Sequence, residues 1–252
     1  MMIVDLDLAW RVEEACLNAW PSPRQILVEG YLLRAAGGRS KRQNSVNPMR
    51  GSGAPEPAIA AARALYRSLG QRPIFRVPAI APQMEPLLGH GDYAVVDETC
   101  TLYRPLDGVP DALDPSVTVA TAPGADWLAL RDAVNQADAA AAQVFRDTVA
   151  ALMLPRVFSS TAAEGGIGAI AFGVLDRGLL VIESVATPAP LRGRGHARRA
   201  VGALLRWSRA QGAEAACLQV VAENTPARSL YRSLGFEREL YRYHYRVGPE
   251  PD

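Results

Sequence analysis

The spacing of apolar residues along this chain follows two periods, and the longer one marks amphipathic helices. Val4, Leu8 and Val12 lie four residues apart and start an apolar stripe that continues to Ala19. Proline or glycine follows most segments with this spacing, and both residues end helices readily. Helices are predicted over residues 3–19, 56–69, 84–88, 125–136, 139–154, 197–211 and 226–234.

A period of two residues, or a short apolar run, marks the strands. The clearest alternation lies near the end of the chain, where Tyr241, Tyr243 and Tyr245 alternate with basic side chains. A hairpin is expected around residues 176–178, where Asp-Arg-Gly joins two apolar runs. Strands are predicted over residues 26–34, 40–46, 73–77, 93–102, 117–120, 156–160, 168–174, 179–186, 215–221 and 240–247.

Strands and helices are interspersed in both halves of the chain, which predicts an α/β fold with a mixed sheet. Residues 104–115 contain three prolines, three aspartates and a glycine, a composition typical of a linker. We therefore expect two domains, residues 1–105 and residues 116–252. The predicted elements of the second domain follow the order β-α-α-β-β-β-α-β-α-β.

Composition narrows the class of protein. An apolar content of 49% and a charged content of 21% are typical of a globular chain, and the net charge of +1 argues against bulk binding to nucleic acid or to an anionic membrane. Cys16, Cys100 and Cys217 lie far apart, lack metal-ligand spacing and are expected to be free thiols in a reducing cytosol. The sequence shows no membrane-spanning run and no signal peptide, so a cytoplasmic location is predicted.

One stretch combines the features of an anion site. The apolar run 179–186 ends in a proline-containing turn, and the basic, glycine-rich loop 192–197 opens directly into a helix. The free N–H groups of a first helical turn bind anions, and the helix dipole adds to this attraction. Gly193 and Gly195 allow the backbone to approach a ligand, while Arg192 and Arg194 add positive charge.

The loop departs from the two commonest phosphate motifs. It lacks the Gly-Lys-Ser/Thr of nucleotide triphosphate binders and the third glycine of the dinucleotide fingerprint. Its pattern, Arg-x-x-Gly-x-Ala at Arg192, Gly195 and Ala197, resembles the pyrophosphate loop of the GNAT superfamily of acyl-CoA-dependent N-acetyltransferases. A tight turn with exposed arginines is the alternative interpretation.

A second segment supports the resemblance. After the strand 215–221, the chain continues with Asn224 and then Ala-x-x-Leu-Tyr-x-x-x-Gly-Phe over residues 227–236, similar to the second GNAT signature segment. Thr225 is the predicted N-cap of this helix, with Pro226 in its first position. The resemblance implies the GNAT fold for about residues 116–247.

The resemblance also implies which residues bind the co-substrate. The loop would hold the diphosphate of acetyl-CoA, and the backbone after residue 184 would pair with the pantetheine arm and polarise the thioester carbonyl. No metal is expected. The implied cofactor-binding residues are Val185, Ala186, Thr187, Arg192, Gly193, Arg194, Gly195, His196, Ala197, Arg198 and Asn224.

Two residues are candidates for catalysis. The resemblance implies that Tyr231 is the family tyrosine that protonates the leaving thiolate, and a packed helix residue is the alternative. Glu183 is the best candidate for the general base, because a carboxylate inside an apolar strand is costly unless it is paired or used. The alternative for Glu183 is an ion pair with an arginine, and Glu223 and His244 are reserve candidates for the base.

The N-terminal half carries an internal echo of the second segment. Residues 62–70 match residues 227–235 at all but one position, so Tyr66 aligns with Tyr231. We interpret the first half as a smaller, degenerate GNAT-like α/β domain in tandem with the second, and it lacks the Arg-x-x-Gly-x-Ala loop. The basic segment around Lys41 and Arg42 is either a solvated sheet face or the rim of a substrate cleft.

The expected function is transfer of an acetyl group from acetyl-CoA to a primary amine in a ternary complex, with the acceptor bound between the domains beside Glu183 and the strand 239–246. A non-catalytic acyl-CoA sensor and a generic nucleotide-phosphate binder are the alternatives. The acceptor, a small-molecule amine or a protein lysine, stays open, as does a homodimer. Neither nucleic acid nor a membrane is an expected partner.

Overall fold

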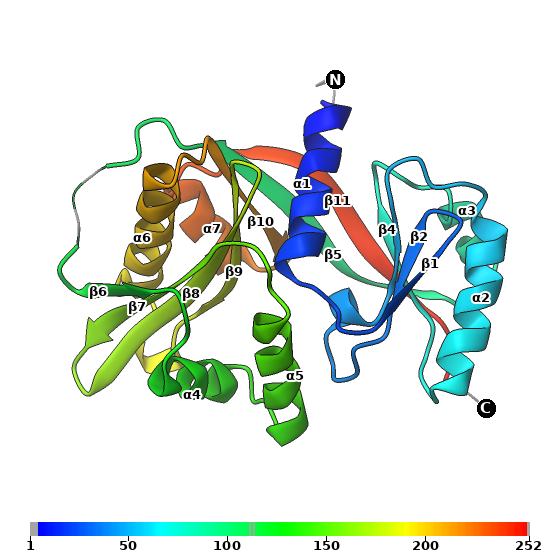
Figure 1. The fold of residues 1–252 in the computed structure, drawn as a ribbon, viewed down its shortest axis with the longest axis horizontal. Helices are drawn as coiled ribbons and strands as arrows, with labels where there is room; N and C mark the ends of the chain where they lie inside the picture. Colours follow the sequence, from blue (N-terminus) through cyan, green and yellow to red (C-terminus); the bar gives the residue numbers. More distant parts are fainter. Residues whose placement is uncertain (1–4, 111, 113, 251–252) are drawn as a thin grey trace.

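A single mixed sheet runs through the computed structural model, which describes residues 5–110, 112 and 114–250. Its eleven strands lie in the order β1-β2-β3-β4-β11-β5-β10-β9-β8-β7-β6. Helices cover both faces, and the long strands β5 (Ala94–Pro105) and β11 (Arg238–Val247) run through the middle of the molecule from one half to the other (Figure 1). The predicted mixed α/β fold is confirmed.

The first helix, α1 (Leu6–Ala19), matches the prediction, whose residues 3 and 4 lie outside the described part of the chain. The Asp5 side chain caps it by accepting a hydrogen bond from the Leu8 backbone N–H at 3.1 Å. Its apolar face packs against strands β8 (Gly166–Asp176), β9 (Leu179–Ala186) and β10 (Ala215–Val221). The start of the chain therefore covers strands from its second half.

Two strand predictions in the first half are wrong. The segment predicted as one strand over residues 26–34 is a hairpin of β1 (Gln25–Val28) and β2 (Tyr31–Arg34). Glu29 and Gly30 both have positive φ, at 48° and 78°, the geometry of a two-residue hairpin turn. The predicted strand 40–46 is instead a short 3₁₀ turn at Lys41–Gln43, followed by β3 (Val46–Pro48).

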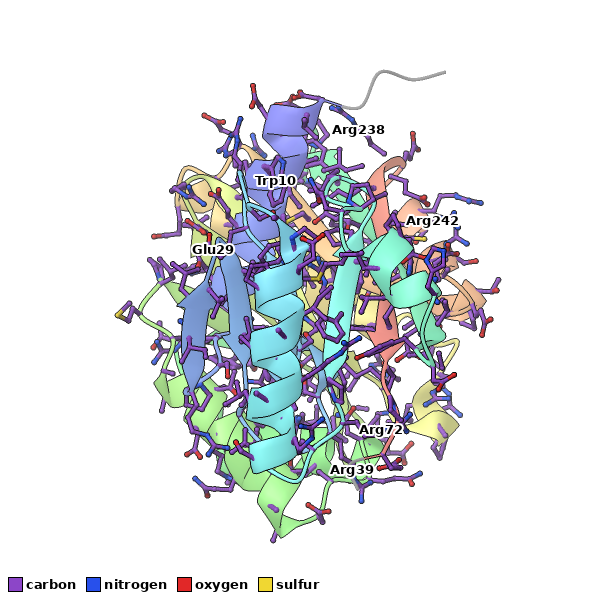
Figure 2. All side chains as sticks on the ribbon, turned by 90° about the vertical axis from the view of Figure 1, so that its right-hand side faces the viewer. Trp10, Glu29, Arg39, Arg72, Arg238 and Arg242 are labelled. Atoms are coloured by element: carbon purple, nitrogen blue, oxygen red, sulfur yellow. The ribbon has the colours of Figure 1, made fainter. Side chains whose placement is uncertain are left out.

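The rest of the first half follows the prediction closely. Its elements are α2 (Pro55–Ser68), β4 (Ile74–Pro78), α3 (Glu85–Gly89) and β5. Figure 2 shows α2 lying across the outer face of the strands, where its apolar side packs on Tyr31, Leu33 and Phe75. The described residues from 106 to the next strand form no helix or strand, as expected for the predicted linker 104–115. The prediction is wrong for Arg104 and Pro105, which are the last residues of β5.

The second half also follows the predicted order of elements. Its segments are β6 (Val117–Ala120), α4 (Ala125–Val134), α5 (Ala139–Ala150), β7 (Arg156–Ala163), β8, β9, α6 (His196–Ala210), β10, α7 (Thr225–Ser233) and β11. Two apolar cores result: α1, α4 and α5 cover one face of the central strands, and α6 and α7 cover the other. The site described below lies where β9 and β10 meet these layers.

Strand order repeats between the halves. In each, three strands pair in an antiparallel way, and a helix then leads to a fourth strand parallel to the third: β1-β2-β3-α2-β4 and β7-β8-β9-α6-β10. By its place in this order of elements, α2 corresponds to α6. The sequence match between residues 62–70 and 227–235 instead relates α2 to α7. The tandem arrangement and the boundary at residues 105 and 116 stay predictions.

Buried polar contacts tie α1 to strands of both halves. Glu13 of α1 is fully buried, forms an ion pair with Arg76 of β4 and accepts a hydrogen bond from the Tyr241 hydroxyl of β11. Arg34 of β2 donates to the carbonyls of Leu17 and Trp20 at the end of α1, at 3.1 and 3.0 Å. Buried charges need such partners, so α1 is held in a defined position between the halves.

Cys16, Cys100 and Cys217 are buried and free, as predicted. Within the described residues, no helix has the length and apolar character needed to cross a membrane.

Candidate functional site

Strands β9 and β10 separate part of the way along their length. Their parallel pairing runs from Leu179 opposite Ala215 to Ile182 opposite Leu218 and then ends. A β-bulge in β9 follows, where Ser184 has a φ of +47°, a conformation that residues other than glycine rarely adopt. The bulge turns β9 away from β10 and leaves the backbone after Ser184 without a partner strand on that side.

A cavity of about 660 Å³ opens beside this split, within the size range of sites for small molecules and cofactors. Its wall combines the end of β9, the loop before α6, the first turn of α6 and one face of α7. Arg194 and Glu183 do not line it. The predicted residues on its wall are Val185, Ala186, Thr187, Arg192, Gly193, Gly195, His196, Ala197, Arg198, Asn224 and Tyr231.

The glycine-rich loop has the backbone geometry of an anion site. Gly193 and Gly195 have φ values of 75° and 78°, which side-chain-bearing residues rarely tolerate. Gly195 is the N-cap of α6 and offers no side chain to the first-turn N–H groups. Arg192, Arg194 and Arg198 are exposed, and none forms an ion pair within the described chain. The loop therefore carries uncompensated positive charge.

The buried side chain of His196 fixes the end of this loop through hydrogen bonds. Its imidazole is buried, and its Nδ1 accepts a hydrogen bond from Arg199 at 2.8 Å, with the Thr161 hydroxyl at 3.2 Å. Because a guanidinium can only donate, the ring proton is assigned to Nε2. Burial lowers the pKa of His196, and the charges of Arg199 and Arg194 lower it further. A neutral ring thus holds the start of α6.

The position opposite His196 must be small. A Cβ at Gly168 would lie 2.2 Å from Nδ1 of His196, so glycine in β8 makes room for the ring. Packing of the loop therefore depends on Gly168, a residue that neither of the two sequence motifs includes.

Tyr231 lies on α7 and is one of the residues that line the cavity. Burial raises the pKa of its hydroxyl, and the negative charge of Glu183 adds to the effect. The phenol therefore keeps its proton at neutral pH. Its counterpart in the echo, Tyr66, donates to the Arg34 carbonyl at 2.7 Å inside the first half.

Asn224 corrects the predicted start of α7. Its Oδ1 accepts a hydrogen bond from the Ala227 backbone N–H at 3.2 Å, so Asn224 and not Thr225 is the N-cap. Thr225 already belongs to the helix because Asn224, whose φ of −75° and ψ of 70° are not helical, supplies the short side-chain acceptor that the cap requires. The Nδ2 group of Asn224 takes no part in the cap bond, and Asn224 is one of the residues that line the cavity.

Glu183 is buried and held by an arginine from the first half of the chain. Arg42 donates from Nη1 to Oε2 at 2.8 Å and from Nη2 to Oε1 at 2.7 Å, and its Nη2 also donates to the Cys16 carbonyl. Burial alone would lower the pKa of Arg42, but the charge and hydrogen bonds of Glu183 raise it above its usual value. The ion pair envisaged as the alternative role of Glu183 is present, and its role as a base stays a prediction.

A second hollow lies on the other side of the split. This junction groove, of about 320 Å³, is bordered by the residues Arg39, Ser40, Lys41, Arg42, Asp97, Thr99, Gln219, Val221, Tyr243 and Tyr245. Gln219 is the first residue of β10 beyond its last pair with β9, so the groove begins where the strands separate. Tyr243 donates to Oε1 of Gln219 at 3.3 Å.

The reserve candidates for the base lie outside the groove wall. His244 is paired with Glu85 at 2.9 Å, and Glu223 is exposed. Sequence reasoning missed Asp97 and Gln219. The bulge that carries Asp97 gives no local signal, because it depends on pairing between strands that are distant in the sequence.

Comparison with known proteins agrees with this geometry. A family model described as "Probable histone acetyltransferase Rv0428c C-terminal" matches residues 10–246. The uncharacterized N-acetyltransferase YobR of Bacillus subtilis is 24% identical over 243 residues, which cover 94% of this chain and 97% of that protein.

Solved structures share the fold over nearly the whole chain. A GCN5-related N-acetyltransferase from Kribbella flavida has a TM-score of 0.68 at 17% identity, with 96% of each chain covered. A putative GNAT-family acetyltransferase from Novosphingobium aromaticivorans has a TM-score of 0.57 at 20% identity and covers 97% of this chain and 96% of its own. By its family match and its fold, this chain belongs to the GNAT N-acetyltransferases, in the family related to the Rv0428c C-terminal region.

Proposed function

We propose that this acetyltransferase moves the acetyl group of acetyl-CoA to a primary amine by direct attack within a ternary complex. The observation that carries the proposal is the split between β9 and β10, which has a cavity with an anion-binding loop on one side and the junction groove on the other. Two reactants entering from opposite sides would meet at one gap in the sheet.

The loop and the first turn of α6 would bind the diphosphate of acetyl-CoA. Free N–H groups at the helix start and the unpaired Arg192 and Arg198 offer both hydrogen bonds and charge to an anion. The pantetheine arm would then extend along residues 185–187 as an added strand, the usual way in which an extended ligand uses free backbone groups. One N–H next to the bulge would polarise the thioester carbonyl.

The reaction needs a neutral amine and a stabilised leaving group. The amine nitrogen attacks the thioester carbon, a C–N bond forms, and collapse of the intermediate breaks the C–S bond. Tyr231, which keeps its proton because burial raises its pKa, would donate to the developing thiolate. Glu183 would accept the proton that the amine loses, directly or through water, once Arg42 releases one of its oxygens.

The alternative function is an acyl-CoA sensor without turnover, and the same ion pair favours it. Both oxygens of Glu183 already accept hydrogen bonds from Arg42, so neither is free to take a proton from an amine unless Arg42 moves. Glu183→Gln and Tyr231→Phe separate the two functions. An enzyme loses turnover but keeps its affinity for the co-substrate, whereas a sensor has no turnover to lose.

The proposal is tested by incubating the purified chain with acetyl-CoA and a panel of primary amines while measuring released free thiol. We expect thiol release that depends on the amine and on the protein. Binding of acetyl-CoA without thiol release for any amine would favour the sensor. Failure to bind acetyl-CoA at all would reject the placement of the diphosphate at residues 192–198.

A further inference from the structure

Lys41 is chemically distinct from every other basic side chain in this protein. The chain has 27 basic residues of the lysine and arginine types, and Lys41 is the only lysine among them. An arginine side chain carries a guanidinium group that stays protonated at neutral pH, so it cannot serve as a neutral primary amine nucleophile. Arginines such as Arg39, Arg72, Arg238 and Arg242 lie at the surface (Figure 2). Lys41 is thus the only side chain that can accept an acetyl group as a primary amine.

This one lysine lies in the junction groove. Lys41 begins the short 3₁₀ turn Lys41–Gln43, and its side chain is 37% exposed along the groove wall. The next residue, Arg42, reaches Glu183 where β9 leaves β10. The turn that carries Lys41 is therefore anchored at the split, on the side from which an acceptor amine would approach.

The ammonium group of Lys41 forms an ion pair with Asp97, a residue whose backbone has a positive φ. Its Nζ lies 2.7 Å from Oδ2 of Asp97. Asp97 has a φ of +54° within a bulge of β5, where Val96 and Thr99 pair with Tyr245 and Tyr243. The Thr99 hydroxyl donates to the Asp97 carbonyl at 2.9 Å and fixes the bulge.

Left-handed backbone at a non-glycine residue is retained only where the surrounding structure enforces it, and it is frequent at functional sites. Here it directs a carboxylate into a groove lined by Gln219 and two tyrosine rings. An alkylammonium bound to a carboxylate beside the split is the arrangement expected for an acceptor amine before reaction. The protein supplies that amine from its own chain.

We propose that Lys41 is a self-acetylation site, acetylated from the acetyl-CoA bound by the same molecule. The proposal rests on the acetyl transfer proposed above. The Lys41 ammonium gives its proton through Asp97 to solvent, and the neutral Nζ attacks the thioester carbon. The new bond is the amide C–N bond, the C–S bond breaks, and coenzyme A leaves as its thiol after taking a proton from Tyr231. Nζ loses its second proton to solvent as the amide forms, and the Tyr231 phenolate takes a proton back from solvent.

Acetylation changes the charge of the groove. Acetyl-lysine is neutral, so the ion pair with Asp97 is lost and this carboxylate becomes free to bind the ammonium of an external acceptor. Modification of Lys41 therefore changes the groove from an occupied to an open acceptor site.

The test is to incubate the full chain with acetyl-CoA, without added amine, and to measure acetyl-lysine by intact mass and peptide mapping. We expect one acetyl group at Lys41, formed with a first-order rate constant that does not change when the protein is diluted. Lys41→Arg, which keeps the positive charge next to Asp97, should remove the signal completely.

Two variants separate enzymatic transfer from direct chemical acetylation. Arg67→Lys places a second lysine on the exposed side of α2, away from the groove, and it should stay unmodified while Lys41 reacts. Arg192→Glu reverses a charge on the cavity wall and should slow acetylation of Lys41 at least tenfold. Equal labelling of both lysines, or labelling unaffected by Arg192→Glu, would overturn the proposal. So would an apparent first-order rate constant that rises with protein concentration, because it would mean that one molecule acetylates another.

The failure of this inference is distinguishable from that of the proposed function. Thiol release with external amines but no acetyl group on Lys41 would overturn self-acetylation alone. Absence of acetyl-CoA binding would overturn both.

Discussion

Reversal of the charge at Arg192 tests where the diphosphate binds. Arg192 lies on the cavity wall, is exposed and forms no ion pair with a described carboxylate. Two unit charges 4 Å apart interact by about 1 kcal/mol when the surroundings are close to water. Arg192→Glu changes the local charge by two units, so the loss against one phosphate charge is about 2 kcal/mol. This corresponds to roughly thirtyfold weaker binding, since about 1.4 kcal/mol is a factor of ten.

The loop contains its own control. Arg194 is also exposed and differs from Arg192 in that it does not line the cavity. Arg194→Glu makes the same charge change two residues away, and we expect it to weaken binding much less. The assay is calorimetric titration with coenzyme A at low and at high salt. Because the Debye length falls to about 3 Å at 1 M salt, the difference between the variants should shrink there.

Two results would refute this reasoning. Equal losses in both variants would mean that only the overall charge matters, and that the cavity does not set the position of the diphosphate. Unchanged affinity in Arg192→Glu would place the diphosphate elsewhere on the molecule.

Three further predictions concern the catalytic and supporting residues. Tyr231→Phe should lower kcat by at least tenfold while the Kd for acetyl-CoA stays within a factor of about three, because only the donated proton is lost. Single-turnover kinetics and equilibrium binding measure the two quantities. A loss of affinity as large as the loss of kcat would contradict the prediction. Arg42→Ala should lower the free energy of unfolding by about 3 kcal/mol, since it leaves Glu183 buried without its partner. Urea denaturation measures this loss, and Arg39→Ala, at a side chain that is 82% exposed, is the control. Equally small losses in the two variants would refute the prediction. His196 should make stability fall as the pH is lowered through about 6.5, because its pKa is lowered in the folded state and the unfolded chain therefore binds more protons near this pH. Thermal unfolding of the protein and of His196→Gln over this pH range checks the prediction. An identical pH dependence in the two proteins would count against it.

Much of the local structure could be predicted from the sequence. Helices such as α1, α2 and α6 were located by apolar spacing and by the glycine or proline that ends them, because these signals act over a few residues. The loop at residues 192–197 was found for the same reason: its glycines, its arginines and the helix start are adjacent in the chain. Errors arose where backbone conformation decided, as at Glu29 and Gly30, whose positive φ values split a predicted strand.

Contacts between distant parts of the chain were decided by the tertiary structure alone. The position of β5 between β10 and β11 depends on strand pairing over more than 100 residues, and no local pattern encodes it. The same pairing brings Arg42 to Glu183 and Lys41 to Asp97, since each partner comes from a different element. The sequence by itself therefore determined the glycine-rich loop at residues 192–197 and the elements around it. Only the folded sheet created the junction groove, because its walls come from four segments that meet at the split.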